Sequence, residues 1–213
     1  MMKHLSLISY VVGVALYFMV VAATLFGWGG CASRGGARVK VKPPAPLPYD
    51  AQLVGEFSAV QADAILRAIL YVDCAVGYPV IGAEGGEELS STLWIQQAWL
   101  DGRKHATFQQ WPGGGLVKLE KSRDGMGVDW WATIVIHELG HALGLSHSSD
   151  REDLMWPYYN LSEALDQKHP LSLNADELRA IRELHGLPRP SYDVTSCHEW
   201  AAQIAREMIG APE

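Results

Sequence analysis

Three histidines in the second half of the chain have the spacing of metal ligands. His137 and His141 stand four residues apart, and His147 follows six residues later. Residues four apart lie on one face of a helix, so both imidazoles can reach one metal ion. Gly144 lets the backbone leave the helix, and His147 can then approach from another direction. Three protein ligands leave a fourth position for water, which is typical of a catalytic zinc.

Glu138 follows the first histidine and is predicted to reach the bound water rather than the metal. Its carboxylate would act as general base, taking a proton as water attacks a peptide carbonyl and passing it to the leaving amine. Zinc would lower the pKa of the water and polarise the carbonyl. The residues therefore predict a zinc-dependent endopeptidase that acts on a protein or peptide substrate.

A second interpretation belongs to another functional class. The chain could be a non-catalytic envelope or phage structural protein that retains a zinc-binding helix as a scaffold. Glu138 has no use at a merely structural zinc, so its presence favours the enzyme. An open fourth position facing a cleft would support the enzyme, and a fourth protein ligand would support the rival.

The sequence around the histidines resembles the metzincins and, within them, the matrixins, the group of the matrix metalloproteinases. Residues 137–147 agree with the zinc signature of that family, and residues 154–159 resemble its Met-turn. The resemblance implies that Met155 lies beneath the zinc site. It also implies that Pro157 and Tyr159 help to form the wall of the pocket for the side chain that follows the scissile bond.

The resemblance is strong over residues 128–186, and over residues 49–127 it extends only to the order of the elements. Upstream of His137 only His4 and His105 occur, so the second, structural zinc site of vertebrate matrixins has no ligand set here. A single zinc ion is implied. The cysteine motif that blocks the zinc in those enzymes is also missing, and calcium ligands cannot be traced.

Apolar periodicity and capping residues predict the helices that must position this site. A first domain helix is expected from Ser58 to about Cys74, ended by Gly77. The zinc helix is expected from about Asp129, with Asp129 as its N-cap. A closing helix is expected over residues 174–186, which begin with a cap residue followed three positions later by Glu.

Residues 91–121 mix short apolar runs with Gly and Pro, a pattern of strands joined by turns. The expected fold class is α+β: a zincin-like metzincin domain with a small twisted, mixed or mostly antiparallel sheet, a zinc-binding active-site helix and a C-terminal helix. By resemblance, the edge strand would bind an extended substrate. Residues 50–188 are assigned to this domain and residues 189–213 to a tail, in which residues 196–209 could form a further helix.

The N-terminal segment contains a long apolar run. Residues 5–26 are uncharged and nearly all apolar. The length of this run is close to the roughly 20 residues that a helix needs to cross a bilayer. Residues 1–30 are therefore predicted to be a signal peptide or a transmembrane anchor. Because the sequence around Cys31 resembles a lipoprotein processing site, lipidation of this cysteine and an uncleaved anchor both stay open, beside a buried helix of the domain. Residues 31–49, rich in Gly and Pro, are predicted to be an extended linker.

The orientation of this anchor is predicted from two opposing signals. Arg34, Arg38, Lys40 and Lys42 follow the apolar run, which by the positive-inside tendency would hold the rest of the chain in the cytoplasm. Lipoprotein processing would instead release it outside, and a protease is more safely kept outside its own cell. The expected location is membrane-anchored or lipid-anchored, with the domain in the cell envelope.

Charge and cysteine content exclude other classes. The formal net charge is -7 and the basic residues are scattered, so nucleic acid is not an expected partner. The three cysteines do not have the spacing of a zinc ribbon or a disulfide scaffold. Cys74 and Cys197 could pair if the domain is exported, although sequence does not establish their proximity.

Two further groups of residues are expected to have structural rather than functional roles. The isolated histidines lack metal-ligand spacing and are expected to be solvated or hydrogen-bonded at the surface: His105, His169, His185 and His198. A cluster of tryptophans could suggest a carbohydrate platform, but most of its members are expected in the core: Trp94, Trp99, Trp111, Trp130 and Trp131.

Overall fold

The computed structural model describes residues 47–82, 91–101, 104–121, 125–151, 153–157 and 172–209. From Val39 onward the chain forms one compact unit. The predicted anchor, residues 1–30, and nearly all of the predicted linker lie outside the described residues. Within the described ranges, no helix combines the length and the apolar character that a membrane span requires.

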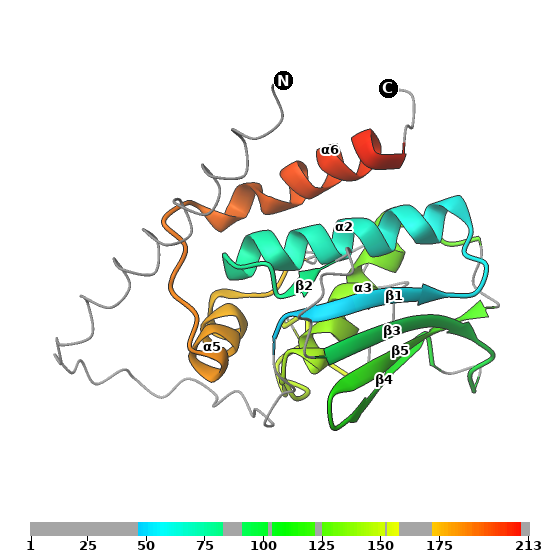
Figure 1. The fold of residues 1–213 in the computed structure, drawn as a ribbon, viewed down its shortest axis with the longest axis horizontal. Helices are drawn as coiled ribbons and strands as arrows, with labels where there is room; N and C mark the ends of the chain where they lie inside the picture. Colours follow the sequence, from blue (N-terminus) through cyan, green and yellow to red (C-terminus); the bar gives the residue numbers. More distant parts are fainter. Residues whose placement is uncertain are drawn as a thin grey trace, which may run out of the picture. The chain divides into compact units, whose positions relative to one another are not determined.

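A mixed sheet of five strands forms one layer of the domain (Figure 1), and its order is β2-β1-β3-β5-β4. The strands are β1 (Tyr49–Val54), β2 (Ile81–Gly82), β3 (Ser91–Ala98), β4 (Ala106–Trp111) and β5 (Gly114–Glu120). Three of the pairings are parallel, and only β4 runs antiparallel to its neighbour β5. The prediction of a mixed sheet is thus confirmed, and the alternative of a mostly antiparallel sheet is wrong. The antiparallel pair follows from the two-residue turn Pro112–Gly113, in which Gly113 has φ 81°.

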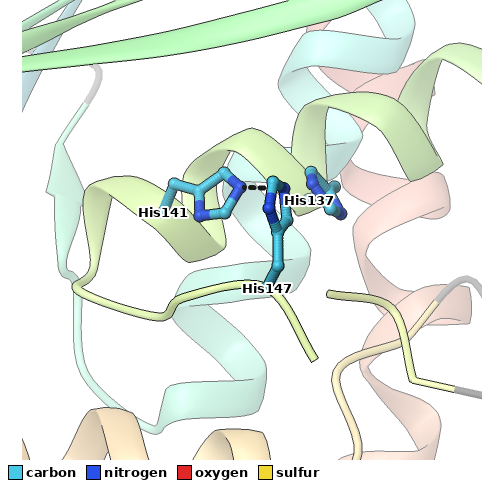
Figure 2. A group of neighbouring side chains, drawn as sticks. All are labelled: His137, His141 and His147. Carbon is cyan, nitrogen blue, oxygen red and sulfur yellow. Dashed lines mark hydrogen bonds between the residues drawn. The ribbon is translucent and has the colours of Figure 1, made fainter. Parts of the chain in front are cut away.

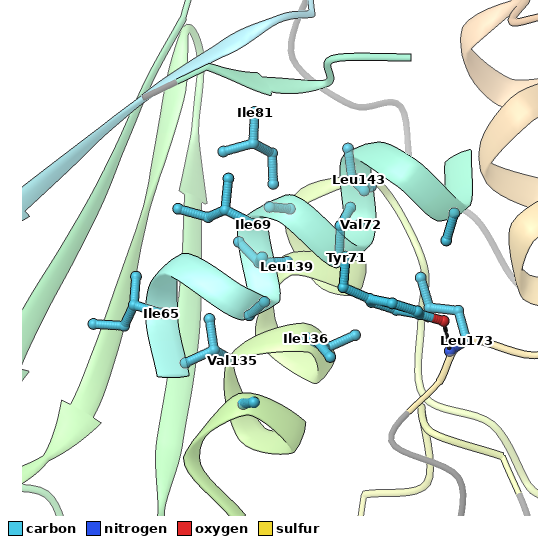
Figure 3. Packing of buried hydrophobic residues seen from close by; sticks show 14 of the residues in the cluster. Ile65, Ile69, Tyr71, Val72, Ile81, Val135, Ile136, Leu139, Leu143 and Leu173 are labelled. Atoms are coloured by element: carbon cyan, nitrogen blue, oxygen red, sulfur yellow. Dashed lines mark hydrogen bonds between the residues drawn. The ribbon is translucent and has the colours of Figure 1, made fainter. Parts of the chain in front are cut away.

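Two long helices cover one face of the sheet (Figure 1): α2 (Ala59–Val76) and α3 (Val128–Ala142). Alternate residues of β3 and β5 point toward them and are fully buried: Leu93, Ile95, Val117 and Leu119. Figure 3 shows α2 packed against α3 through apolar side chains such as Ile65, Ile69, Val135, Ile136 and Leu139. The same view shows that the backbone N–H of Leu173 donates to the hydroxyl of Tyr71 at 2.9 Å. This bond connects α2 to the segment just before the helix that begins at Ala175.

The helix ends agree closely with the capping signals. Ser58 and Gln61 form a capping box at the start of α2, and Gly77 ends it with φ 82°. The closing helix α5 (Ala175–His185) begins with a capping box of Asn174 and Glu177 and ends at Gly186, which has φ 64°. Both predicted helices are therefore confirmed.

The predicted N-cap of the zinc helix is wrong. Gly127 occupies the cap position of α3, and Asp129 lies inside the first turn without a capping hydrogen bond. A carboxylate there still interacts favourably with the helix dipole. It also lies 3.8 Å from the guanidinium of Arg67 on α2.

The expected helix in the C-terminal tail is present as α6 (Cys197–Ile209), preceded by the short 3-10 helix η2 (Val194–Ser196). It packs along α2 with small residues on its buried side, among them Ala201 and Ala205. Cys197 forms a disulfide with Cys74 of α2, with the two Cα atoms 5.6 Å apart. The structure thus resolves the pairing that the sequence left open.

The prediction that most of the five tryptophans belong to the core is wrong. Trp130 and Trp131 of α3 are buried, but Trp94 is 40% exposed, Trp111 37% and Trp99 74%. Trp94 alternates with the buried Leu93 and Ile95, so it points to the opposite face of the sheet. Strand alternation therefore overrides the preference of tryptophan for the interior.

Candidate metal centre

The C-terminal half of α3 positions two of the three histidines. His137 and His141 lie one turn apart, with their ring centroids separated by 4.8 Å. The helix stops after Ala142, and Gly144 adopts φ 97°, in the left-handed region that favours glycine. The chain then reverses and brings His147 back toward the other two rings, as Figure 2 shows.

The three imidazoles converge on one point. One ring nitrogen from each lies within 4.8 Å of the other two. The Nε2 atoms of His141 and His147 are 3.1 Å apart (Figure 2). Two nitrogens bound to one tetrahedral zinc at the usual distance lie about 3.3 Å apart. The donor set and its spacing therefore fit a zinc ion.

Backbone carbonyls orient the two helical ligands. The Nδ1 atom of His137 lies 2.7 Å from the carbonyl oxygen of Leu154, and that of His141 lies 2.8 Å from the carbonyl oxygen of Leu145. A carbonyl only accepts hydrogen bonds, so each Nδ1 carries the proton and each Nε2 keeps its lone pair. Burial, followed by the neighbouring His141, lowers the pKa of His137 to about 3, which keeps this ring neutral.

Glu138 is buried beside the first ligand. It is the next residue on α3 after His137 and lies within one turn of His141, so it belongs to the same part of the helix. Burial raises the pKa of its carboxyl group to about 8, because a charged carboxylate is poorly solvated there.

Met155 packs directly under α3. It is fully buried, and a Cβ atom added to Gly140 would come within 2.6 Å of its Sδ atom. The backbone N–H of Ser148 donates to the carbonyl of Met155 at 2.9 Å, which closes the loop that carries His147. The absence of a side chain at Gly140 therefore allows this loop to approach the zinc helix closely.

Helix α5 holds the same loop from the other side. The buried Glu177 accepts the backbone N–H of Met155 at 3.1 Å and that of Asn174 at 2.8 Å. Asp153 accepts a bond from the side-chain amide of Asn174 at 2.6 Å and another from the hydroxyl of Ser148. Sequence reasoning identified Glu177 only as part of a capping box, because its second bond joins residues 22 positions apart.

The remaining residues singled out in the sequence have other surroundings or lie outside the part of the chain that the structure describes. Pro157 is half-buried, whereas Tyr159 and His169 lie outside the described residues. His185 lies with Nε2 3.1 Å from the carbonyl oxygen of Leu143, and His198 stacks on Tyr71 at 3.9 Å between ring centroids. His105 meets the ring of Trp130 edge-on, at 5.2 Å between centroids.

Comparison with known proteins relates this region to one family. Residues 96–186 match the family model described as matrixin. Stromelysin-3 of Xenopus laevis is 46% identical over 57 residues, which cover 27% of this chain and 11% of that protein. Stromelysin-1 of Mus musculus is 44% identical over 61 residues, covering 29% of this chain and 12% of that protein. Matrilysin of Felis catus is 40% identical over 62 residues, covering 29% and 22%. The matches thus span about a tenth to a fifth of the length of these relatives.

Proposed function

On the premise that the chain carries a matrixin-like metzincin catalytic domain, we propose that it is a zinc-dependent endopeptidase. The observation that carries the proposal is the convergence of three imidazoles next to a buried glutamate. A purely structural zinc needs a closed set of four protein ligands. The group found among the described residues contains three.

His137, His141 and His147 would hold the zinc ion through their Nε2 atoms. Zinc, when bound, supplies Lewis acidity that acidifies water and polarises a carbonyl group. The carbonyls of Leu154 and Leu145 keep two of the rings in the tautomer that binds a cation.

Glu138 would act as the general base. A cation held by the three histidines would favour the ionised form of its carboxyl group. That carboxylate would accept a proton from the attacking water and deliver it to the leaving amine, so both steps use one side chain. Its place on α3 beside His137 supports this role. Met155, packed under α3, would support the metal-binding loop, and Pro157 with Tyr159 would form part of the substrate pocket.

The edge strand β4 is the proposed docking element for the substrate. It is one of the two outermost strands of the sheet, at the end opposite β2, and it pairs with β5 on one side. An extended peptide can add to such an edge through main-chain hydrogen bonds. This mode would place the peptide next to the sheet rather than inside the helical layer.

We place the domain in the cell envelope. The disulfide between Cys74 and Cys197 supports an oxidising compartment. The apolar run over residues 5–26 and Cys31 would supply a transmembrane or lipid anchor. The packing of α6 on α2 supports a domain that extends beyond residue 188 to include this helix.

The endopeptidase and the rival scaffold function differ in the role of Glu138, which is needed for peptide hydrolysis but not for a structural zinc. In the full chain, Glu138→Gln keeps the size of the side chain but removes the carboxylate. Peptide hydrolysis should fall by about 10² to 10⁴ while the zinc content stays that of the wild type. A quenched peptide library and elemental analysis measure the two quantities. A wild-type protein that holds zinc and cleaves no peptide, or a Glu138→Gln variant that cleaves at the wild-type rate, supports the scaffold instead.

A further inference from the structure

The face of the sheet turned away from α2 and α3, the outer face, carries an unusual set of side chains. Of the helices that the structure describes, α2 and α3 cover the opposite face (Figure 1). Strand alternation sends the partners of the buried Leu93, Ile95, Val117 and Leu119 outward. The outward side chains include Gln52, Thr92, Trp94, Gln96, Thr107, Gln109, Trp111 and Leu116.

Two half-exposed indoles lie on this face at neighbouring positions of the register. Trp111 of β4 pairs with Gly114 of β5, while Trp94 of β3 pairs with Leu116 of β5. The two tryptophans are therefore separated by two strand spacings, about 10 Å, and by one step of about 7 Å along the strands. A short linear ligand can span this distance and contact both rings.

Gly114 allows the indole of Trp111 to lie against the sheet. A Cβ atom at Gly114 would come within 3.0 Å of the indole Nε1 and within 2.4 Å of the carbonyl oxygen of Thr92. The ring therefore lies over the backbone of β5, on the side where β3 and Trp94 follow. One surface of the ring is covered by the sheet, and 37% of the residue remains open to solvent.

The polar groups around the two indoles are uncharged for the most part. Amides come from Gln52, Gln96 and Gln109, and hydroxyls come from Thr92 and Thr107. Along the paired strands, the outward positions with a charge are Asp50, Lys118 and Glu120, of which Glu120 is buried. Phosphate backbones and anionic lipid surfaces require clustered Lys and Arg, so this surface does not suit them. It suits a neutral ligand that presents both C–H groups and hydroxyls.

We propose that the outer face binds a neutral glycan strand, with one sugar ring packed on Trp94 and another on Trp111. The C–H groups of a sugar ring pack on the negative face of an aromatic ring, and the surrounding amides and hydroxyls bond to the sugar hydroxyls. Because Trp111 lies on the edge strand β4, a bound glycan would hold a peptide linked to it near that edge. The binding site depends on the outer-face residues alone, and only its link to proteolysis rests on the proposed function.

The test is calorimetric titration of the full chain with chitohexaose, an uncharged linear oligosaccharide. Trp94→Ala and Trp111→Ala should each weaken binding about three- to tenfold, the effect of losing one aromatic contact. Trp94→Phe keeps a ring and should retain most of the affinity, even if the alanine variants fold poorly. Trp200→Ala is the matched control, since Trp200 is 43% exposed but lies on α6. The monomer N-acetylglucosamine should bind more weakly than the hexamer, because it reaches one ring only.

Three results would overturn the proposal. The first is that chitohexaose does not bind, and the second is that Trp200→Ala weakens its binding as much as Trp94→Ala does. The third is that the wild type self-associates and Trp94→Ala abolishes this association, which would assign the outer face to a second copy of the chain. Two further measurements distinguish a failure of this glycan proposal from a failure of the proposed peptidase function. Removal of zinc should leave chitohexaose binding unchanged, and Trp94→Ala should cleave an unglycosylated peptide at the wild-type rate.

Discussion

The metal centre and the pair of helices α2 and α6 are held together by different forces. In the metal centre, His137, His141 and Met155 are positioned by hydrogen bonds to backbone groups or to the buried Glu177. The helix pair relies on the burial of small apolar residues and on the disulfide between Cys74 and Cys197. Hydrogen bonds are directional, so they can orient a reactive group. Apolar burial and a covalent link add stability with less control of orientation.

The largest effect is expected from the loss of one metal ligand. His141→Ala removes one of three imidazoles and should abolish tight zinc binding, and with it peptide hydrolysis. His185→Ala is a control histidine outside the three ligands and should keep the zinc. Elemental analysis after dialysis measures both. Zinc retained by His141→Ala would mean that the metal is bound elsewhere.

The disulfide should affect stability but not the metal site. Cys74 and Cys197 are 123 positions apart, and loss of a native disulfide that closes a long loop costs about 2 to 5 kcal/mol. We expect Cys197→Ala with Cys74→Ala to lower the free energy of unfolding by that amount in urea titrations. The zinc affinity of the folded fraction should stay unchanged. A parallel loss of zinc affinity would show that the two regions are coupled.

A substitution of Glu177 should lower the zinc affinity, although this residue lies far from the three histidines in sequence. Glu177→Ala leaves the buried N–H group of Met155 and the half-buried N–H group of Asn174 without their acceptor, at a cost of about 1 to 3 kcal/mol in stability. Zinc affinity should fall about 10- to 100-fold, as for other losses of support around metal ligands. Competition with a chromogenic chelator measures the affinity. Glu183→Ala, on the same helix, is the control and should leave it unchanged.

The last expected effect is a pH dependence of stability that arises from two carboxyl groups, one in each region. Burial raises the pKa of Glu177 to about 7 and that of Asp73 on α2 to about 7. Asp73 accepts the N–H groups of Val80 and Ile81, each at 2.9 Å. Both raised values mean that the folded protein binds protons more tightly than the unfolded chain. The contribution of these two groups to the free energy of unfolding is therefore fully present below about pH 4 and is lost as the pH rises through 7.

Urea titrations of the zinc-free protein between pH 4 and pH 8 measure this slope. Asp73→Asn keeps an oxygen acceptor but removes the titration, so the loss of stability between pH 4 and pH 8 should be smaller than that of the wild type by about 4 kcal/mol at most. An Asp73→Asn variant with the same pH dependence as the wild type would contradict the raised pKa of Asp73.

Sequence reasoning predicted well what depends on neighbouring residues. The ends of α2 and α5 were predicted because Ser58, Gly77, Asn174 and Gly186 act on the backbone within one turn. Strands β1 and β2 were missed. Strand β2 has only two residues, and both strands are defined by parallel pairing with distant segments rather than by a local pattern. The cap of α3 was placed at Asp129 instead of Gly127, because an acidic residue is favourable at either position.

By itself, the sequence determined which residues of one helix share a face and where the main helices end, since these features arise from contacts a few residues long. It therefore identified the ligand pair on α3 and the turn at Gly144. Only the tertiary structure decided that Glu177 bonds to Met155, that Cys74 meets Cys197, and that Trp94 faces outward beside Trp111. These outcomes depend on how separate elements pack, and that packing is set by the burial of many side chains at once.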